Sequence, residues 1–211
     1  MISFLEFSAF VITLIYQFLF FWMLHTFIPL RKSLILRILA FFASLPITDV
    51  LVYTNDLANI LLSLCGLILY LFVFHQGKIM EKITAVFTFY SIMISINFLM
   101  MDVSSKIFFA VTNASSEQGK WTYGVRLANG GIWAASCLVR LLFWLGIYSF
   151  LRKPLMQIRL NLTTKMWLIV DSIILASTVG CFTSIYFTSG QSAVIYPLCI
   201  ACIFSSLGCV C

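Results

Sequence analysis

Cysteines are the residues of this chain that most readily suggest chemistry, and two of them have the spacing of a metal or redox motif. The chain has seven cysteines, and Cys199 and Cys202 form a Cys-x-x-Cys pair. The two residues between them are apolar and the pair lies in a long apolar run, where a thiol does not readily become the thiolate that a metal needs. We therefore predict no metal site and no cofactor, and we interpret the cysteines as small apolar packing residues.

Few side chains could serve catalysis. The only two histidines, His25 and His75, are 50 residues apart, and no cysteine follows His75 closely enough to suggest a cysteine nucleophile with its base. The sequence also contains no glycine-rich phosphate loop, zinc-binding helix or serine elbow. We predict that the chain, as it stands, is not an enzyme.

Two ionisable residues lie well inside apolar runs. Arg140 shares one helical face with Trp133, Cys137 and Trp144, and Asp171 lies about six residues into the next run. A charge in hydrocarbon costs roughly 2.5–3.5 kcal/mol on insertion scales, so each is a functional candidate. One interpretation is an intramembrane ion pair that holds one of two signalling states. In the other, Arg140 contacts Trp144 or backbone carbonyls and Asp171 reaches towards the membrane surface.

Hydroxyl side chains form a second polar feature. Thr84, Thr88, Ser91 and Ser95 recur at spacings of four, three and four, which places them on one helical stripe. Such stripes usually hold helices together by hydrogen bonds across a close interface, and this is the interpretation we favour. A conduction path or a substrate groove is the alternative.

These residues are positioned by seven apolar stretches. The chain of 211 residues is 62% hydrophobic and 9% charged, against roughly 25% charged residues in soluble domains. A helix needs about 20 apolar residues to cross a bilayer. We predict an all-α integral membrane bundle of about seven transmembrane helices, in a single domain over residues 1–211, with an outer loop at 102–130. The predicted spans are 4–24, 34–53, 57–74, 83–101, 131–150, 166–186 and 193–211.

The basic residues predict the orientation. Of the 13 lysines and arginines, most fall in or beside the loops on one side of the predicted spans. By the positive-inside rule those loops are cytoplasmic, so the N-terminus is outside and the C-terminus is cytoplasmic. The net charge of +6 thus indicates topology and lipid contacts rather than a nucleic-acid partner. We predict a multi-pass protein of a cell membrane. The basic residues on that side are Arg31, Lys32, Arg37, Lys78, Lys82, Arg152, Lys153, Arg159 and Lys165.

The predicted outer loop 102–130 holds the ligand-binding candidates. It begins at Asp102 and offers Trp121 and Tyr123. Aromatic residues at that depth most often anchor a protein at the membrane interface. The functional alternative is that they form one wall of a binding site for an extracellular peptide or small amphiphile.

Three stretches carry a resemblance to a family. The basic segment 74–83, the arginine-bearing segment 139–143 and Leu151-Arg152-Lys153 are similar to the N-terminal multi-span sensor region of bacterial histidine kinases of the peptide quorum-sensing receptor type, whose cytoplasmic part carries a GHKL-type ATP-binding domain. The likeness extends over nearly the whole chain. It implies an extracellular ligand, helix rearrangement towards the cytoplasm, a homodimer and a place in a two-component system.

The kinase part of that family would follow the seventh span, and this sequence ends at Cys211. We therefore expect a sensor without its catalytic output domain, in either a truncated chain or a product that has lost its downstream part. The alternative from another class is the substrate-binding membrane subunit of a small-molecule uptake transporter, which has the same size and number of spans.

Overall fold

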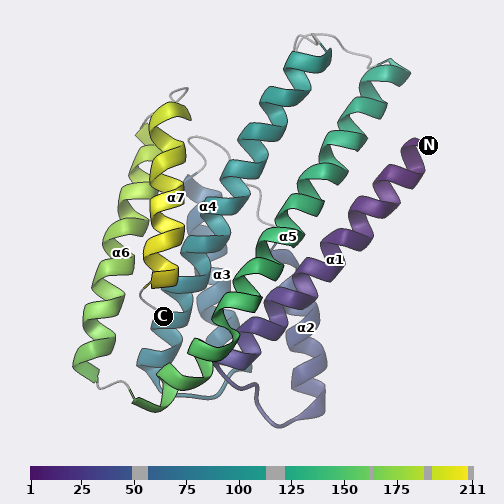
Figure 1. The fold of residues 1–211 in the computed structure, drawn as a ribbon. Coiled ribbons are helices and arrows are strands. Elements are labelled where there is room, and N and C mark those ends of the chain that lie inside the picture. Colours follow the sequence, from purple (N-terminus) through teal and green to yellow (C-terminus); the bar gives the residue numbers. More distant parts are fainter. Residues whose placement is uncertain (49–56, 113–121, 162–163, 188–191, 209–211) are drawn as a thin grey trace.

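The described part of the chain is helical. The computed structural model describes residues 1–48, 57–112, 122–161, 164–187 and 192–208, which form seven helices with one isolated β-bridge between loops (Figure 1). The helices are α1 (Ile2–Phe27), α2 (Leu34–Thr48), α3 (Leu57–Phe74), α4 (Ile79–Thr112), α5 (Tyr123–Asn161), α6 (Thr164–Phe187) and α7 (Ser192–Gly208).

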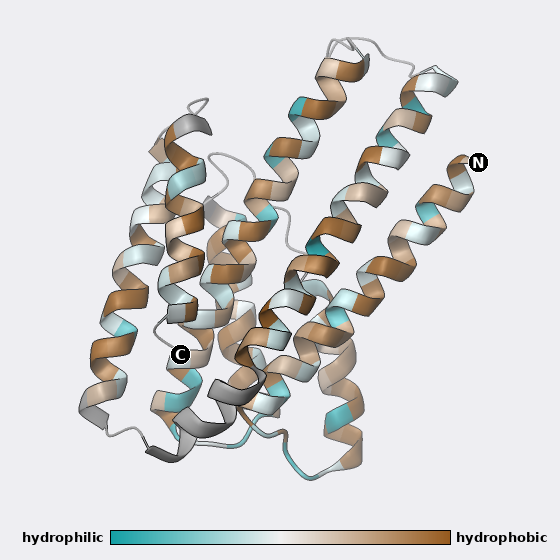
Figure 2. Ribbon diagram, viewed as in Figure 1, coloured by the Kyte–Doolittle hydropathy of each residue, from teal (hydrophilic) through white to brown (hydrophobic). Residues whose placement is uncertain are grey.

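Four of these helices are long and apolar enough to cross a membrane: α1, α4, residues Tyr123–Leu151 of α5 and Met166–Phe187 of α6. The other three are apolar but shorter over their described residues. Hydrophobic residues dominate all seven helices (Figure 2), and large apolar side chains such as Phe4 and Leu62 are more than 70% exposed. An apolar surface of this extent is typical of an α-helical membrane protein.

The helices α4 and α5 are longer than the spans predicted for them. The predicted spans were 83–101 and 131–150, yet α4 continues to Thr112 and α5 begins at Tyr123, so much of the predicted loop 102–130 is helical. The run from Asp102 to Thr112 has no glycine or proline, and Lys106 forms an ion pair with Asp102 one turn earlier, at 2.7 Å. Such i, i+4 pairs support a helix beyond the apolar region. In Figure 1 these ends of α4 and α5 extend past the other helices.

Helix α4 is the centre of the bundle. It packs against α3, α5, α6 and α7, and almost every side chain from Thr84 to Phe98 is buried. Helix α5 packs on α1 and α4, α6 packs on α4 and α7, and α2 packs on α1 and α3. The bundle therefore has an α1–α5 side and an α6–α7 side, joined through α4.

Two loops are joined at the end of the bundle that carries Arg31, Arg37, Lys78 and Lys82, which we call the basic end. Leu30, between α1 and α2, forms a β-bridge with His75, between α3 and α4. Next to this bridge, the Arg31 amide donates to the Phe74 carbonyl at 3.0 Å. The loops therefore hold α1, α2, α3 and α4 together through backbone hydrogen bonds.

The His75 side chain completes this connection. Its ring is 1% exposed, and Nδ1 lies 2.7 Å from the carbonyl oxygen of Ile28, to which a neutral ring donates its proton. Burial lowers the pKa of His75 from 6.5 to about 4, because a charged ring would lose its hydration. His75 is thus neutral at physiological pH and acts as a structural hydrogen-bond donor.

This pKa predicts a pH dependence of stability. The pKa of His75 is lower in the folded state than in the unfolded state. The neutral ring therefore contributes fully to the free energy of unfolding above about pH 6.5, and this contribution is lost as the pH falls towards 4. The full change in the pKa corresponds to about 3 kcal/mol in the free energy of unfolding. Thermal unfolding in lipid nanodiscs between pH 7 and 4 should show a smaller loss of stability in His75→Gln than in the natural chain. Parallel losses in the two proteins would contradict this role.

Candidate functional site

Helices α1 and α5 run parallel and pack in one constant register. The Thr13 hydroxyl donates to the Cys137 thiol at 3.6 Å, and the Phe20 and Trp144 rings lie edge to face with centroids 5.3 Å apart. In each of these pairs the α5 residue follows the α1 residue by 124 positions. Contacts that keep one offset over two turns require two helices that point the same way and pack side by side.

The same offset describes a continuous line of facing residues, which we call the α1–α5 seam. Both helices repeat the spacing four, three, four, three, four, the spacing of the core positions in a parallel coiled coil. Most of these side chains are buried. The seam consists of Ala9, Thr13, Tyr16, Phe20, Met23 and Phe27 on α1 and of Trp133, Cys137, Arg140, Trp144, Ile147 and Leu151 on α5.

Arg140 lies in the middle of this seam. Its side chain is 3% exposed, Nη1 donates to the Tyr16 hydroxyl at 2.9 Å, and the guanidinium carbon lies 5.3 Å from the centre of the Tyr16 ring. Tyr16 therefore offers both a hydrogen-bond acceptor and an aromatic face to the cation.

Asp171 lies on a different helix interface, and the structure does not bring it to Arg140. Its carboxyl group is buried between α6 and α4, where the Thr84 side chain approaches it. Neither carboxylate oxygen accepts a hydrogen bond of ordinary geometry from a described residue. The ion pair, one of the two interpretations of the sequence, does not form, because Arg140 faces α1 from α5, whereas Asp171 faces α4 from α6.

The hydroxyl stripe of α4 faces α6, the helix that carries Asp171. Ser91 hydrogen-bonds to Thr178, and the Ser95 hydroxyl lies 3.8 Å from the Cys181 thiol. These pairs place α4 and α6 parallel to each other, with their polar sides in contact. The stripe is therefore part of a buried helix interface, as the structural interpretation of the sequence predicts.

Cys199 and Cys202 lie beside a third buried cysteine. The thiols of Cys181 on α6 and Cys199 on α7 are 3.5 Å apart, and Cys202 belongs to the same cluster. All three side chains are buried. Across the described residues, no group of histidine, cysteine and acidic side chains has an arrangement that could hold a metal ion. The cysteines pack α6 against α7.

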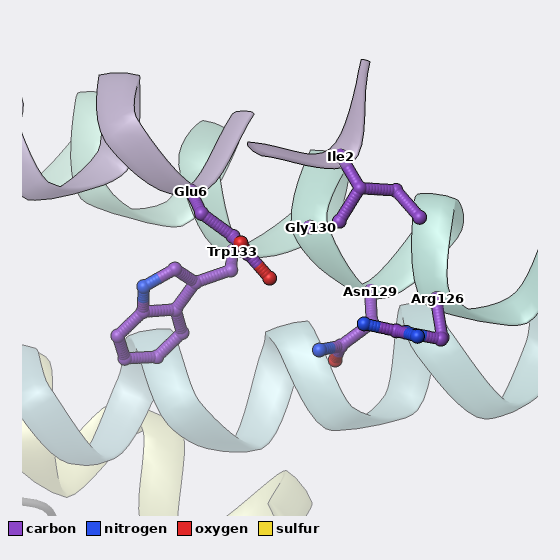
Figure 3. Close-up of a pocket in the computed structure, with 6 residues that line it drawn as sticks. All are labelled: Ile2, Glu6, Arg126, Asn129, Gly130 and Trp133. Atoms are coloured by element: carbon purple, nitrogen blue, oxygen red, sulfur yellow. The ribbon is translucent and has the colours of Figure 1, made fainter. Parts of the chain in front are cut away.

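A pocket lies at the end of the seam opposite the basic end. It has a volume of about 330 Å³ and lies between the start of α1 and the start of α5 (Figure 3). Its polar groups are the Glu6 carboxylate, the Arg126 guanidinium and the Asn129 amide, and the Trp133 ring forms an apolar wall. Ile2 and Gly130 complete the lining. In Figure 3 the Glu6 carboxylate points into the space beside Trp133 and Asn129.

The charged groups of this pocket are open to a ligand. Glu6, Arg126 and Asn129 are exposed, and the structure records no hydrogen bond or ion pair from their side chains to another described residue. An anionic and a cationic group at one opening can together bind a ligand that carries both charges. Trp133 can contact an apolar part of the same ligand.

Two of the ligand-binding candidates named from the sequence, Asp102 and Tyr123, do not line this pocket. Asp102 accepts hydrogen bonds from Lys106 on its own helix and from Tyr196 on α7. Tyr123 is 63% exposed in the first turn of α5, and Trp121 lies outside the described residues. The pocket residues Glu6, Arg126 and Asn129 escaped the sequence analysis, although Arg126, Asn129 and Trp133 have the spacing of one helical face.

The fold is typical of an α-helical membrane protein, and it has a polar pocket at one end of a parallel helix pair. Comparisons with protein-family models, curated proteins and solved structures found no match to the chain.

The seam predicts which residues depend on each other. Tyr16→Phe and Arg140→Leu should show a coupling free energy of about 1 kcal/mol in a double-mutant cycle, since each removes the same buried hydrogen bond. Arg140→Leu and Asp171→Leu should be additive, because their side chains lie on separate interfaces. Unfolding in mixed micelles measures both cycles. Coupling of Arg140 to Asp171 with none to Tyr16 would contradict this structure.

Proposed function

We propose that this chain is the membrane sensor domain of a bacterial two-component signalling receptor, and that it detects an extracellular peptide or small amphiphile. The observation that supports this most directly is the pocket at the end of the α1–α5 seam. A binding site at one membrane face and an uninterrupted helix pair leading to the other face are the two parts that a transmembrane sensor needs.

The charge distribution supports the orientation. Arg31, Arg37, Lys78 and Lys82 lie at the basic end, and we propose that this end faces the cytoplasm, with seven helices crossing the cell membrane. Glu6 and Arg126 then open to the outside, with the N-terminus. A ligand released by cells could reach the pocket without crossing the bilayer.

The pocket chemistry favours a short peptide. The Arg126 guanidinium fits a carboxylate, the Glu6 carboxylate fits an amine or guanidine, and Trp133 fits an apolar side chain. A volume of about 330 Å³ is at the lower end of small-molecule sites, so it would enclose a part of a peptide rather than the whole of it.

The seam supports a path for the signal. A ligand that contacts Glu6 on α1 and Arg126 on α5 changes the packing of these two helices where their contact begins. Both helices continue to the basic end, where α5 extends to Asn161. We infer that the ligand shifts α1 relative to α5 and that α4, which packs on both α5 and α7, passes this shift to α7, the helix after which the output domain of a homodimeric kinase would follow.

This function can be tested with the purified chain in lipid nanodiscs. The probe is a panel of short amphipathic peptides that carry a free amine and a free carboxylate, and the measurement is the ligand-dependent rise in unfolding temperature. A binding peptide should lose at least about tenfold in affinity on Arg126→Gln, which corresponds to one lost charge-assisted hydrogen bond. Lys78→Gln, which removes a positive charge at the basic end, should bind normally.

Two results would contradict the proposal. Equal loss of affinity in Arg126→Gln and Lys78→Gln would indicate general charge attraction rather than a site. Accumulation of the labelled peptide inside vesicles that contain the protein would indicate an uptake subunit, the alternative considered from the sequence, because a sensor binds its ligand without moving it across the bilayer.

A further inference from the structure

A second concave site lies at the basic end, on the outer surface of the bundle between α1 and α2. It has a volume of about 390 Å³, and nearly all of its lining is apolar. Phe18, Phe21 and Trp22 of α1 face Phe41 and Ile38 of α2. Leu30 lies at its end, where the chain passes from α1 to α2.

Aromatic rings form the inner part of this groove. Phe41 lies edge to face with both Phe18 and Phe21, with ring centroids 6.2 and 5.6 Å apart. Trp22 is 48% exposed and stacks with Phe18 at 6.3 Å. These contacts give the groove a floor of aromatic carbon. A surface of this kind has no hydrogen bonds to offer water and is suited to a hydrocarbon chain.

Two hydrogen-bond donors stand at the mouth of the groove. Arg37 uses its Nε to donate to the Arg31 carbonyl at 3.2 Å, and its two terminal nitrogens have no recorded bond to a described residue. His25 accepts the Leu30 amide proton on Nδ1 at 3.1 Å, so a neutral His25 ring carries its own proton on Nε2. Both side chains line the groove. Together they match the oxygens of a phosphate.

The length of the groove restricts what can occupy it. From Phe18 to His25 the α1 helix rises about 10 Å, which is about a third of the hydrocarbon thickness of a bilayer. The groove therefore stays within one leaflet. A lipid of that leaflet can fill it, whereas a spanning helix would extend far beyond it.

We propose that this groove is a binding site for an anionic phospholipid of the leaflet at the basic end. One acyl chain lies along Phe18, Trp22 and Phe41, and the phosphate accepts hydrogen bonds from Arg37 and His25. Lys32 and Arg31 lie in the same loop and add positive charge. A zwitterionic lipid is disfavoured because its quaternary ammonium group would lie among these cations. The groove is separate from the pocket between the starts of α1 and α5, and this proposal does not rest on the proposed sensor function.

Helix α2 would be the element that responds to this lipid. It packs on α1 and α3, and the groove occupies its contact with α1 beside Phe41 and Ile38. A bound acyl chain adds apolar contacts to both helices at once. The lipid therefore occupies the space between α1 and α2 and fixes α2 against the α1–α5 seam.

Trp22 permits a local test of lipid identity. The chain is placed in vesicles of phosphatidylcholine and phosphatidylglycerol in which either lipid carries brominated acyl chains, which quench tryptophan fluorescence on contact. The difference between the natural chain and Trp22→Phe gives the Trp22 signal. We expect brominated phosphatidylglycerol to quench Trp22 more than brominated phosphatidylcholine does, at equal amounts of brominated lipid.

Matched variants separate a site from general charge attraction. Arg37→Gln should bring the ratio of quenching by the two lipids to one, and Arg37→Lys, which keeps the charge, should keep part of the preference. Lys78→Gln removes a charge at the same end but outside the groove and should leave the ratio unchanged. Equal quenching of the natural chain by both lipids, or an equal effect of Lys78→Gln and Arg37→Gln, would overturn the proposal.

Discussion

The packing of α1 against α5 is the constraint on which the rest of the structure depends. Tyr16 can meet Arg140 only because the two helices are parallel and keep one offset of 124 residues along their contact. The same offset brings Glu6, Arg126 and Trp133 to one pocket at one end, and it holds Phe20 on Trp144 nearer the other. A shift of α1 by one turn would leave the guanidinium without this acceptor in hydrocarbon, a cost that fixes the register.

The other buried polar groups follow the same physical rule on the opposite side of α4. The hydroxyls of Ser91 and Thr178 bond to each other, and Ser95 lies beside Cys181. Because water is absent from hydrocarbon, polar side chains gather where two helices meet and satisfy one another. Arg140 and Asp171 therefore lie in two different polar interfaces, Arg140 between α1 and α5 and Asp171 between α4 and α6.

Much of the fold could be predicted from the sequence, since apolar runs and their periodicity predict helices and buried faces. The face of Trp133, Cys137, Arg140 and Trp144 was predicted and is the face that packs in the seam. The helix that covers this face, α1, was not predicted, because periodicity shows which side of a helix is buried but not which helix covers it. The short connection from α5 to α6 favoured Asp171 as the partner of Arg140, whereas α5 packs on α1, more than 100 residues away in sequence.

The pocket was missed for a related reason. Glu6 and Arg126 each look like an ordinary charged residue near a membrane surface, and only the seam brings them to one opening. The extent of α4 and α5 was underestimated because hydropathy measures where a helix leaves the apolar region, and not where its backbone hydrogen bonds end. A local pair such as Asp102 and Lys106 supports the helix beyond that point.

Disulfide formation across the seam is the most direct test of this arrangement. Thr13 lies against Cys137, so a Thr13→Cys chain should form a bond to Cys137 when a membrane-permeable oxidant is added in lipid. Leu14→Cys, one residue further along α1, points to another side of the helix and should not form it, and Cys137→Ser removes the partner. We predict a bond for Thr13→Cys alone. No bond for Thr13→Cys, or an equal yield for Leu14→Cys, would contradict the α1–α5 register.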